Sequence, residues 1–171
     1  MIENRPKAPH AVLAAIVLGL AVVAVVQSPN TPTAPQGRAV ESVRLGTPPN
    51  PEALRVGLTG APVLGRPWQP FVDHSTFMPD ANFDFLVLSK DPANRMLPGI
   101  GTLLVDPDRP FVVRVVPAGE PFLLRVPLNA STIGKTYTVQ AASTDGIGPQ
   151  LTNAIDVIVG APPRPQPQDR R

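Results

Sequence analysis

The sequence predicts an all-β protein: a small antiparallel β-sandwich of about seven or eight strands, preceded by one N-terminal apolar helix. Two observations lead to this prediction. After residue 30, short runs of apolar and β-branched residues recur between turn residues, and no stretch keeps a helical period of useful length. The chain has 171 residues, which leaves room for one domain of ordinary size.

Residues 1–27 are predicted to be a signal peptide or a signal anchor. The run from Ala11 to Val26 has no charge and follows Arg5 and Lys7. As a helix it would span roughly 24 Å, a little less than a hydrocarbon core of roughly 30 Å. Its cleavage sites are imperfect, which favours an uncleaved membrane anchor over a cleaved signal peptide. A buried core helix is the weakest interpretation, because the adjacent Pro-rich segment could not cover an apolar surface on all sides.

The basic residues before this run predict a cytoplasmic N-terminus and a domain outside the membrane. That domain would be anchored in the inner membrane through Ala11 to Val26, or would be secreted or periplasmic after cleavage. Residues 28–52 are predicted to be an extended Pro-rich linker, within which AVESVRL could pair as a first edge strand. The β-sandwich is expected over 53–160, and a disordered Pro- and Arg-rich tail over 161–171.

Eight runs are predicted to be strands, at a spacing typical of a sandwich or a barrel. They are Leu54 to Leu58, Pro67 to Val72, Phe83 to Leu88, Gly101 to Val105, Phe111 to Val116, Pro121 to Pro127, Thr136 to Ala142 and Leu151 to Val159. In the seventh run, Tyr137, Val139 and Ala141 share a side, opposite Thr138 and Gln140. One side of that strand is therefore expected to be buried and the other wet.

The C-terminal half contains a series of short motifs. They are a Leu- and Pro-rich strand over 123–127, a turn from Ser131 to Gly134, Tyr137 with Gln140 and Ala141, and Leu151 with Asn153 ahead of Gly160. From about Leu58 to Gly160, the chain resembles a large group of uncharacterised exported β-sandwich domains of planctomycete and myxobacterial type. The resemblance implies the fold and implies no activity. The chain departs from the pattern in its possible anchor and in the tail APPRPQPQDRR.

Several of these residues have physical reasons for their identity. Gly134 and Gly146 are expected to supply turn conformations with positive φ. Gln140 and Asn153 lie in neighbouring predicted strands, where an amide side chain can hydrogen-bond main-chain groups that the sheet leaves open. The last two runs would then form a hairpin whose apolar face completes the core.

The composition argues against several classes of function. Lys and Arg number 15 and Asp and Glu number 13, so the net charge is only +2, too small to indicate a nucleic-acid surface. The chain has no Cys, which excludes disulfides and thiolate metal sites. No pattern indicates a cofactor, and LPGIGTLL lacks the Lys-Ser/Thr of a phosphate loop.

The segment VDHSTFMPDANFD is the most suggestive place for catalysis. Consecutive residues on an extended segment alternate sides, so Asp73, His74 and Ser75 cannot form a hydrolase triad by themselves. A zinc site that combines His74 with aspartates is a second interpretation. The favoured interpretation is a solvated loop in which Ser75 or Asp80 caps a turn.

Two weaker candidates lie elsewhere. Asp106 and Asp108 in VDPDRP could bind calcium, although no DxDxDG pattern is present and an Asp-Pro turn explains the same residues. Trp68 is the only Trp of the chain. It could form a platform for a glycan or a peptide, with His74 as a further contact, but a lone Trp is more often a core anchor.

These observations predict a non-catalytic, exported or membrane-tethered β-sandwich protein with a structural or binding role at the cell envelope. Its partners would be the membrane, if the N-terminal segment is uncleaved, and a protein or glycan. The chief alternative is a single-span periplasmic subunit of an envelope transport or secretion assembly, which an exposed sheet edge or apolar patch would favour. A hydrolase around Asp73, His74 and Ser75 is the third hypothesis.

Overall fold

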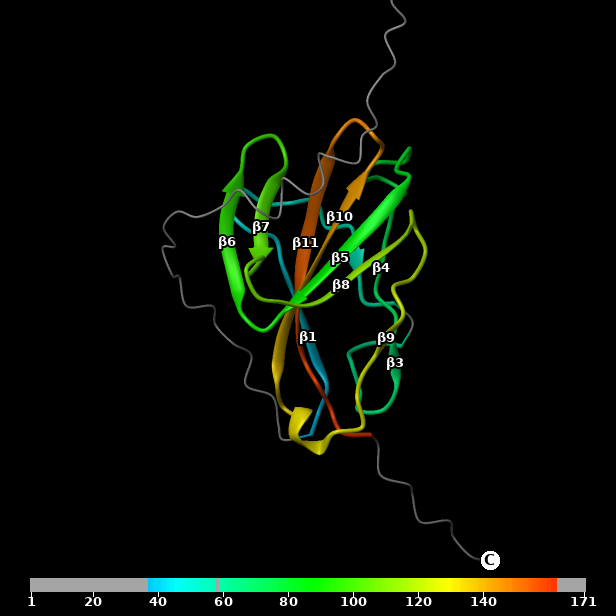
Figure 1. Ribbon diagram of the computed structural model, residues 1–171, viewed down its shortest axis with the longest axis vertical. Helices are drawn as coiled ribbons and strands as arrows, with labels where there is room; N and C mark the ends of the chain where they lie inside the picture. The colour runs from blue at the N-terminus through cyan, green and yellow to red at the C-terminus, as the bar shows by residue number, and fades with distance from the viewer. Residues whose placement is uncertain (1–36, 58, 163–171) are drawn as a thin grey trace, which may run out of the picture.

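The computed structural model describes residues 37–57 and 59–162 (Figure 1). In this part of the chain, every regular element is a β-strand except one short 3-10 helix, η1 (Ala130–Thr132). The strands are β1 (Val40–Arg44), β2 (Leu54–Arg55), β3 (Pro67–Trp68), β4 (Phe71–Val72), β5 (Phe83–Ser89), β6 (Pro92–Leu97), β7 (Gly101–Val105), β8 (Pro110–Pro117), β9 (Leu124–Arg125), β10 (Thr136–Thr144) and β11 (Pro149–Ile158). The protein is therefore all-β there, as predicted. The predicted apolar helix and the tail from residue 163 lie outside the described residues.

Five strands form one large antiparallel sheet in the order β1, β11, β10, β5, β8 (Figure 1). β10 and β11 are the predicted hairpin. The carboxylate of Asp145 closes its turn by accepting hydrogen bonds from the N–H groups of Ile147 and Gly148. β8 and β1 are the two edges of the sheet. Because β1 pairs along β11, the residues predicted as linker (28–52) include a strand, and the folded unit begins before residue 53.

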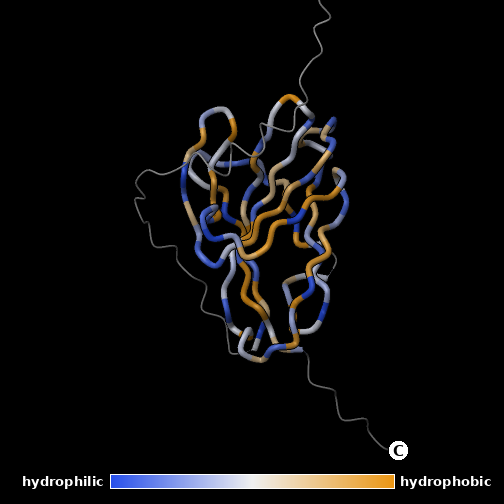
Figure 2. The backbone as a smooth tube through the Cα atoms, viewed as in Figure 1, coloured by the Kyte–Doolittle hydropathy of each residue, from blue (hydrophilic) through white to orange (hydrophobic). Residues whose placement is uncertain are grey.

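Three two-stranded sheets, β2–β4, β3–β9 and β6–β7, complete the structure. The main core lies on one face of the large sheet, where β5, β10 and β11 pack against β2, β3, β4 and β9. The central strands consist largely of hydrophobic residues, and the hydrophilic residues lie largely in the surrounding loops (Figure 2). Across the sheet, β7 contacts β10 and β11, so β6–β7 covers part of the opposite face.

Because β6–β7 covers this face, the prediction that one side of β10 is exposed to water is wrong. Thr138 and Gln140 are each only 2% exposed. Strand β6, which the sequence did not indicate, begins at Pro92 and contains Asn94 and Arg95, so it lacks the apolar alternation of a typical strand. It pairs with β7, and together the two strands exclude water from this side of β10.

The predicted strand over 121–127 is shortened to β9. Its alternation is present: Phe122 and Leu124 are buried, whereas Leu123 is 53% exposed. Gly134 and Gly146 have positive φ, as expected. Gly160 serves a different need, because a side chain there would collide with the backbone of Ala39.

Candidate functional site

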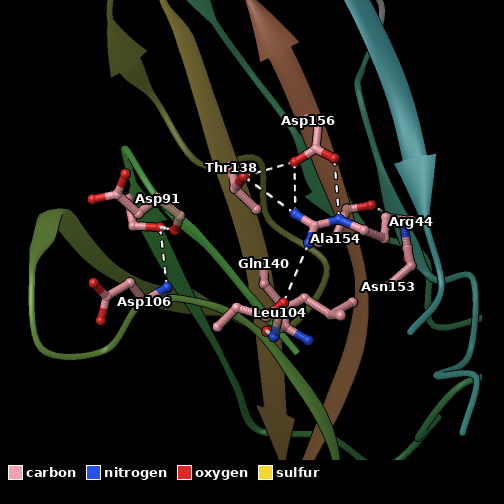
Figure 3. Close-up of polar contacts among 11 residues, drawn as sticks. Arg44, Asp91, Leu104, Asp106, Thr138, Gln140, Asn153, Ala154 and Asp156 are labelled. Carbon is pink, nitrogen blue, oxygen red and sulfur yellow. Dashed lines mark hydrogen bonds and ion pairs between the residues drawn. The ribbon is translucent and has the colours of Figure 1, made fainter. Parts of the chain in front are cut away.

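Buried amide side chains fasten the smaller sheets and a loop to the large sheet. Gln140 accepts a hydrogen bond from the N–H of Leu104 at 2.8 Å and donates to the carbonyl groups of Thr102 and Thr152 (Figure 3). Asn50 likewise bonds both the N–H and the carbonyl of Thr102. Each amide therefore forms the hydrogen bonds that a neighbouring strand would otherwise form with these buried main-chain groups.

Asn153 does the same on the core face, where its amide bonds the N–H and the carbonyl of Leu54 in β2. The main-chain bonds of Gln140 and Asn153 are the kind expected from the sequence. All these groups are fully engaged within the protein. They explain how the layers are held, and they leave nothing free for a ligand.

Arg44 and Asp156 form the shortest ion pair in the described residues. The guanidinium donates to both carboxylate oxygens, at 2.7 and 3.1 Å, and also reaches the carbonyl of Ala93 (Figure 3). Thr138 donates a third hydrogen bond to the carboxylate at 2.6 Å. This network joins β1 to the rest of the sheet, and its donors and acceptors are likewise taken.

A second polar cluster surrounds Asp84, which is fully buried on the core face of β5. Its carboxylate accepts hydrogen bonds from the hydroxyl of Ser143 and from the N–H of Gly119, and it faces Nε2 of His74 at 3.0 Å. Nδ1 of His74 lies 2.7 Å from the carbonyl of Phe77. Asp84 belongs to the segment VDHSTFMPDANFD that the sequence indicated, although no pairing with His74 was predicted. The signal was present, because Asp84 shares a side with the apolar Leu86.

This cluster stabilises the protonated form of the His74 ring. Burial alone would lower the pKa of His74, but the hydrogen bonds to Asp84 and to the Phe77 carbonyl outweigh burial and raise the pKa above its ordinary value. Both ring nitrogens face acceptors, so both carry protons when these contacts form. The ring then has no lone pair to offer as a base.

The residues of the hypothetical triad do not converge. The Asp73 carboxylate accepts from the N–H of Ser75, which lowers the pKa of Asp73, and His74 turns instead to Asp84. Asp73 and Ser75 thus form the solvated turn that the sequence favoured. Asp106 similarly accepts from the N–H of Asp108. In the described segments, no three His, Asp or Glu side chains gather as metal ligands would.

A cavity of about 280 Å³ lies between the large sheet and the β3–β9 sheet. Its walls are mainly apolar. Residues from the large sheet and its ends are Leu88, Phe111, Val112, Arg114, Tyr137, Val157 and Val159. The opposite wall contains Pro62, Trp68, Leu123, Leu124, Arg125, Val126, Pro127 and Thr132. The volume approaches the lower end of the range for small-molecule sites, roughly 300 Å³.

Trp68 is the residue that sets this cavity apart. Its side chain is 2% exposed and belongs to the core, yet it also lines the cavity. Within the described residues, its Nε1 is the only buried side-chain nitrogen or oxygen without a hydrogen-bond partner. Buried polar groups are nearly always paired, so this unpaired indole N–H is an exception among the described side chains.

Two arginines line the same cavity. Arg114 comes from the edge strand β8 and Arg125 from β9, and both are exposed. This cavity was not predicted from the sequence, because its walls come from segments far apart in the chain. Arg114, an isolated charge within the apolar run FVVRVV, was the available signal.

Within the described residues there is no helix with the length and hydropathy needed to cross a membrane. Comparisons of the chain with protein-family models, with curated proteins and with solved structures found no match. The resemblance to exported β-sandwich domains therefore remains a prediction that rests on the motifs quoted above.

Proposed function

We propose that this chain is a non-catalytic binding protein of the cell envelope, whose β-domain takes a small, largely apolar ligand into the cavity beside Trp68. The single observation that carries this proposal is a cavity of about 280 Å³ with mainly apolar walls, to which Trp68, Phe111 and Tyr137 all contribute. These walls would bind an apolar ligand by excluding water.

We also propose a fold class and a cellular location for the β-domain. We regard the large sheet and the smaller sheets that cover it as an elaborated β-sandwich. The charge-free run from Ala11 to Val26, with Arg5 and Lys7 ahead of it, supports export with the β-domain outside the membrane. The Pro-rich residues before β1 would separate the domain from the bilayer if the N-terminal segment remains as an anchor.

Binding can be tested with benzyl alcohol, a small uncharged aromatic probe suited to an apolar cavity. The whole chain in lipid nanodiscs, with a scaffold protein that lacks Trp, is titrated while the fluorescence of Trp68 is followed. We expect a saturable change. Val126→Phe should abolish it by filling the cavity, and Val113→Phe, on the outer face of β8, should not. A linear response, or one that survives Val126→Phe, would contradict a binding role.

The address can be tested by the intact mass of the native protein in soluble and membrane fractions. A full-length species confined to membranes would support the anchor. A soluble species that lacks about the first 24 to 28 residues would support a cleaved signal peptide. A full-length species confined to the cytoplasm would contradict export.

One observation favours the alternative, an envelope assembly subunit. β8 is an edge strand, and Val113 and Val115 on it are 50% and 53% exposed, next to Phe83 on β5. Such an apolar edge could pair with a strand of another protein. The variant Val113→Lys/Val115→Lys should then reduce the size of the native complex extracted from membranes, whereas Leu128→Lys, at another exposed site, should leave it unchanged. An unchanged size in both variants would exclude this use of β8.

A further inference from the structure

We propose that β8 is a self-complementary edge through which two copies of this chain pair, antiparallel and about a two-fold axis at Arg114, so that their large sheets join into one. The inference does not depend on ligand binding in the cavity. It assigns a second copy of the chain to the exposed edge of β8.

The edge of β8 is open to solvent. Six of its eight residues are exposed, and only Val112 and Val116 are half-buried. In the described part of the chain, no strand pairs with the side of β8 that faces away from β5. The opposite edge, β1, has two charged side chains among its five residues, and charges of this kind protect an edge from pairing. The only charge within β8 is Arg114, so β8 is the less protected edge.

The main-chain groups of Val113 and Val115 point to this open side. In an antiparallel pair, successive residues direct their N–H and C=O groups alternately toward and away from the neighbouring strand. Ala118, just after β8, donates its N–H to the carbonyl of Asn82, just before β5, and the register stays regular from Pro117 to Val112. The even-numbered residues of this stretch therefore face β5, whereas Val113 and Val115 direct their N–H and C=O groups outward.

The regular stretch of β8 reads the same in both directions. Residues 112–116 are VVRVV, with Arg114 at the centre. In a two-fold pair, residue i contacts residue j and residue j contacts residue i. Centred on Arg114, such a pair places Val113 opposite Val115 of the second copy, and their outward main-chain groups meet in hydrogen bonds. Valine then lies opposite valine on both sides of the axis.

The pairing also gives partners to apolar side chains that are exposed in the single chain. Val113 and Val115 are 50% and 53% exposed on the face of the sheet away from the main core. In the pair, each of them lies beside a valine of the second copy on that face. Cross-strand contacts between side chains are a main source of stability in a sheet.

Arg114 opposes the association and limits its strength. Its guanidinium donates to the carbonyl of Val113 at 2.9 Å, an acceptor that the second copy would use. In the pair, the two Arg114 side chains would lie directly opposite each other, where like charges destabilise a sheet. Pro117 has no N–H and ends the strand, so the paired stretch is short.

The test uses the fact that the chain contains no Cys, so that an introduced thiol is the only site of disulfide formation. In the proposed pair, the Cα atoms of residue 114 in the two copies are about 4.5 Å apart, which a disulfide can span. The whole chain with Arg114→Cys is oxidised in detergent micelles and analysed by non-reducing electrophoresis. Arg109→Cys, at an exposed arginine whose two copies would lie at opposite ends of the paired strands, is the matched control.

We expect Arg114→Cys to form a disulfide-linked dimer roughly ten-fold faster than Arg109→Cys, because the paired strands hold the two thiols together. In sedimentation experiments on chains without Cys, Arg114→Gln should tighten the dimer roughly three-fold by removing the repulsion between like charges. Added salt should tighten the dimer of the unmodified chain by screening the same repulsion. Val113→Lys/Val115→Lys should abolish the dimer, because lysine would then lie opposite lysine.

Equal oxidation of the two Cys variants would mean that the chains associate through another region, and would overturn the inference. A chain that stays monomeric at every concentration would overturn it as well. If Val113→Lys/Val115→Lys reduces the native complex while Arg114→Cys forms no dimer, the partner of β8 is another protein. The fluorescence titration with benzyl alcohol tests the binding function separately, so either proposal can fail without the other.

Discussion

The two faces of the large sheet differ in one buried polar group. On the face covered by β6–β7, Gln140 and Asn50 are buried, and their amides bond main-chain atoms of β7. On the core face, the indole N–H of Trp68 is buried without a partner, next to a cavity. The polar groups of one face are thus satisfied within the protein, whereas one donor of the other face is open.

The contrast shows that the unpaired N–H of Trp68 is unusual in this protein. Leaving a buried donor unpaired typically costs about 1–3 kcal/mol, and elsewhere in the described residues the chain avoids such a cost even where it must use side chains to mimic a strand. The unpaired indole N–H of Trp68 is therefore a local cost that the other described side chains avoid.

The largest effect is expected in the closely packed part of the core face. Phe122 is fully buried, so Phe122→Ala should lower the free energy of unfolding by about 4 kcal/mol through lost burial and the space left behind. Urea denaturation of the whole chain measures this loss. Leu123→Ala, next to it but half exposed, should cost less than about 1 kcal/mol. Equal losses would contradict the burial of Phe122 and the exposure of Leu123.

On the opposite face, Gln140→Leu keeps a side chain of similar size and removes the bonds to β7. The N–H of Leu104 then loses its side-chain partner, so we expect a loss of about 3 kcal/mol in the same assay. Gln150→Leu, at an exposed position in β11, is the matched control and should change stability by less than about 0.5 kcal/mol. A small effect of Gln140→Leu would mean that β6–β7 is held by something else.

The cluster around Asp84 should make stability depend on pH. Because the pKa of His74 is raised above its ordinary value of 6.5 in the folded state, its contribution is fully present below about pH 6.5 and is lost as pH rises through the folded pKa. His74→Gln should lower stability by about 1–2 kcal/mol at low pH and by less at high pH. Urea midpoints across this range measure the difference, which would be constant if His74 were neutral throughout.

The smallest effect is expected at the open donor itself. Trp68→Phe removes a buried polar group, like Gln140→Leu, but breaks no hydrogen bond within the protein. In the ligand-free chain, the loss should be about 1 kcal/mol, from the smaller ring alone. A loss as large as that of Gln140→Leu would show that the indole N–H has a partner in solution, and the contrast between the faces would disappear.

Local patterns were sufficient for much of this fold. The hairpin of β10 and β11 was predictable, because both strands have sustained β-forming sequences and a Gly-rich turn lies between them. β1 was anticipated as an edge strand from AVESVRL, although it lay within a segment that its prolines predicted to be linker. β6 was not predictable, because its Pro, Asn and Arg carry no strand signal and its pairing with β7 determines its conformation.

Residue type and near neighbours were enough to predict the all-β class, the positive φ of Gly134 and Gly146, and main-chain hydrogen bonds of Gln140 and Asn153. What surrounds each side chain could not be predicted in this way. The tertiary structure turned His74 away from Asp73 toward Asp84, covered the second side of β10, and brought Trp68, Arg114 and Arg125 around one cavity. These outcomes depend on contacts between segments far apart in the chain, which no local pattern specifies.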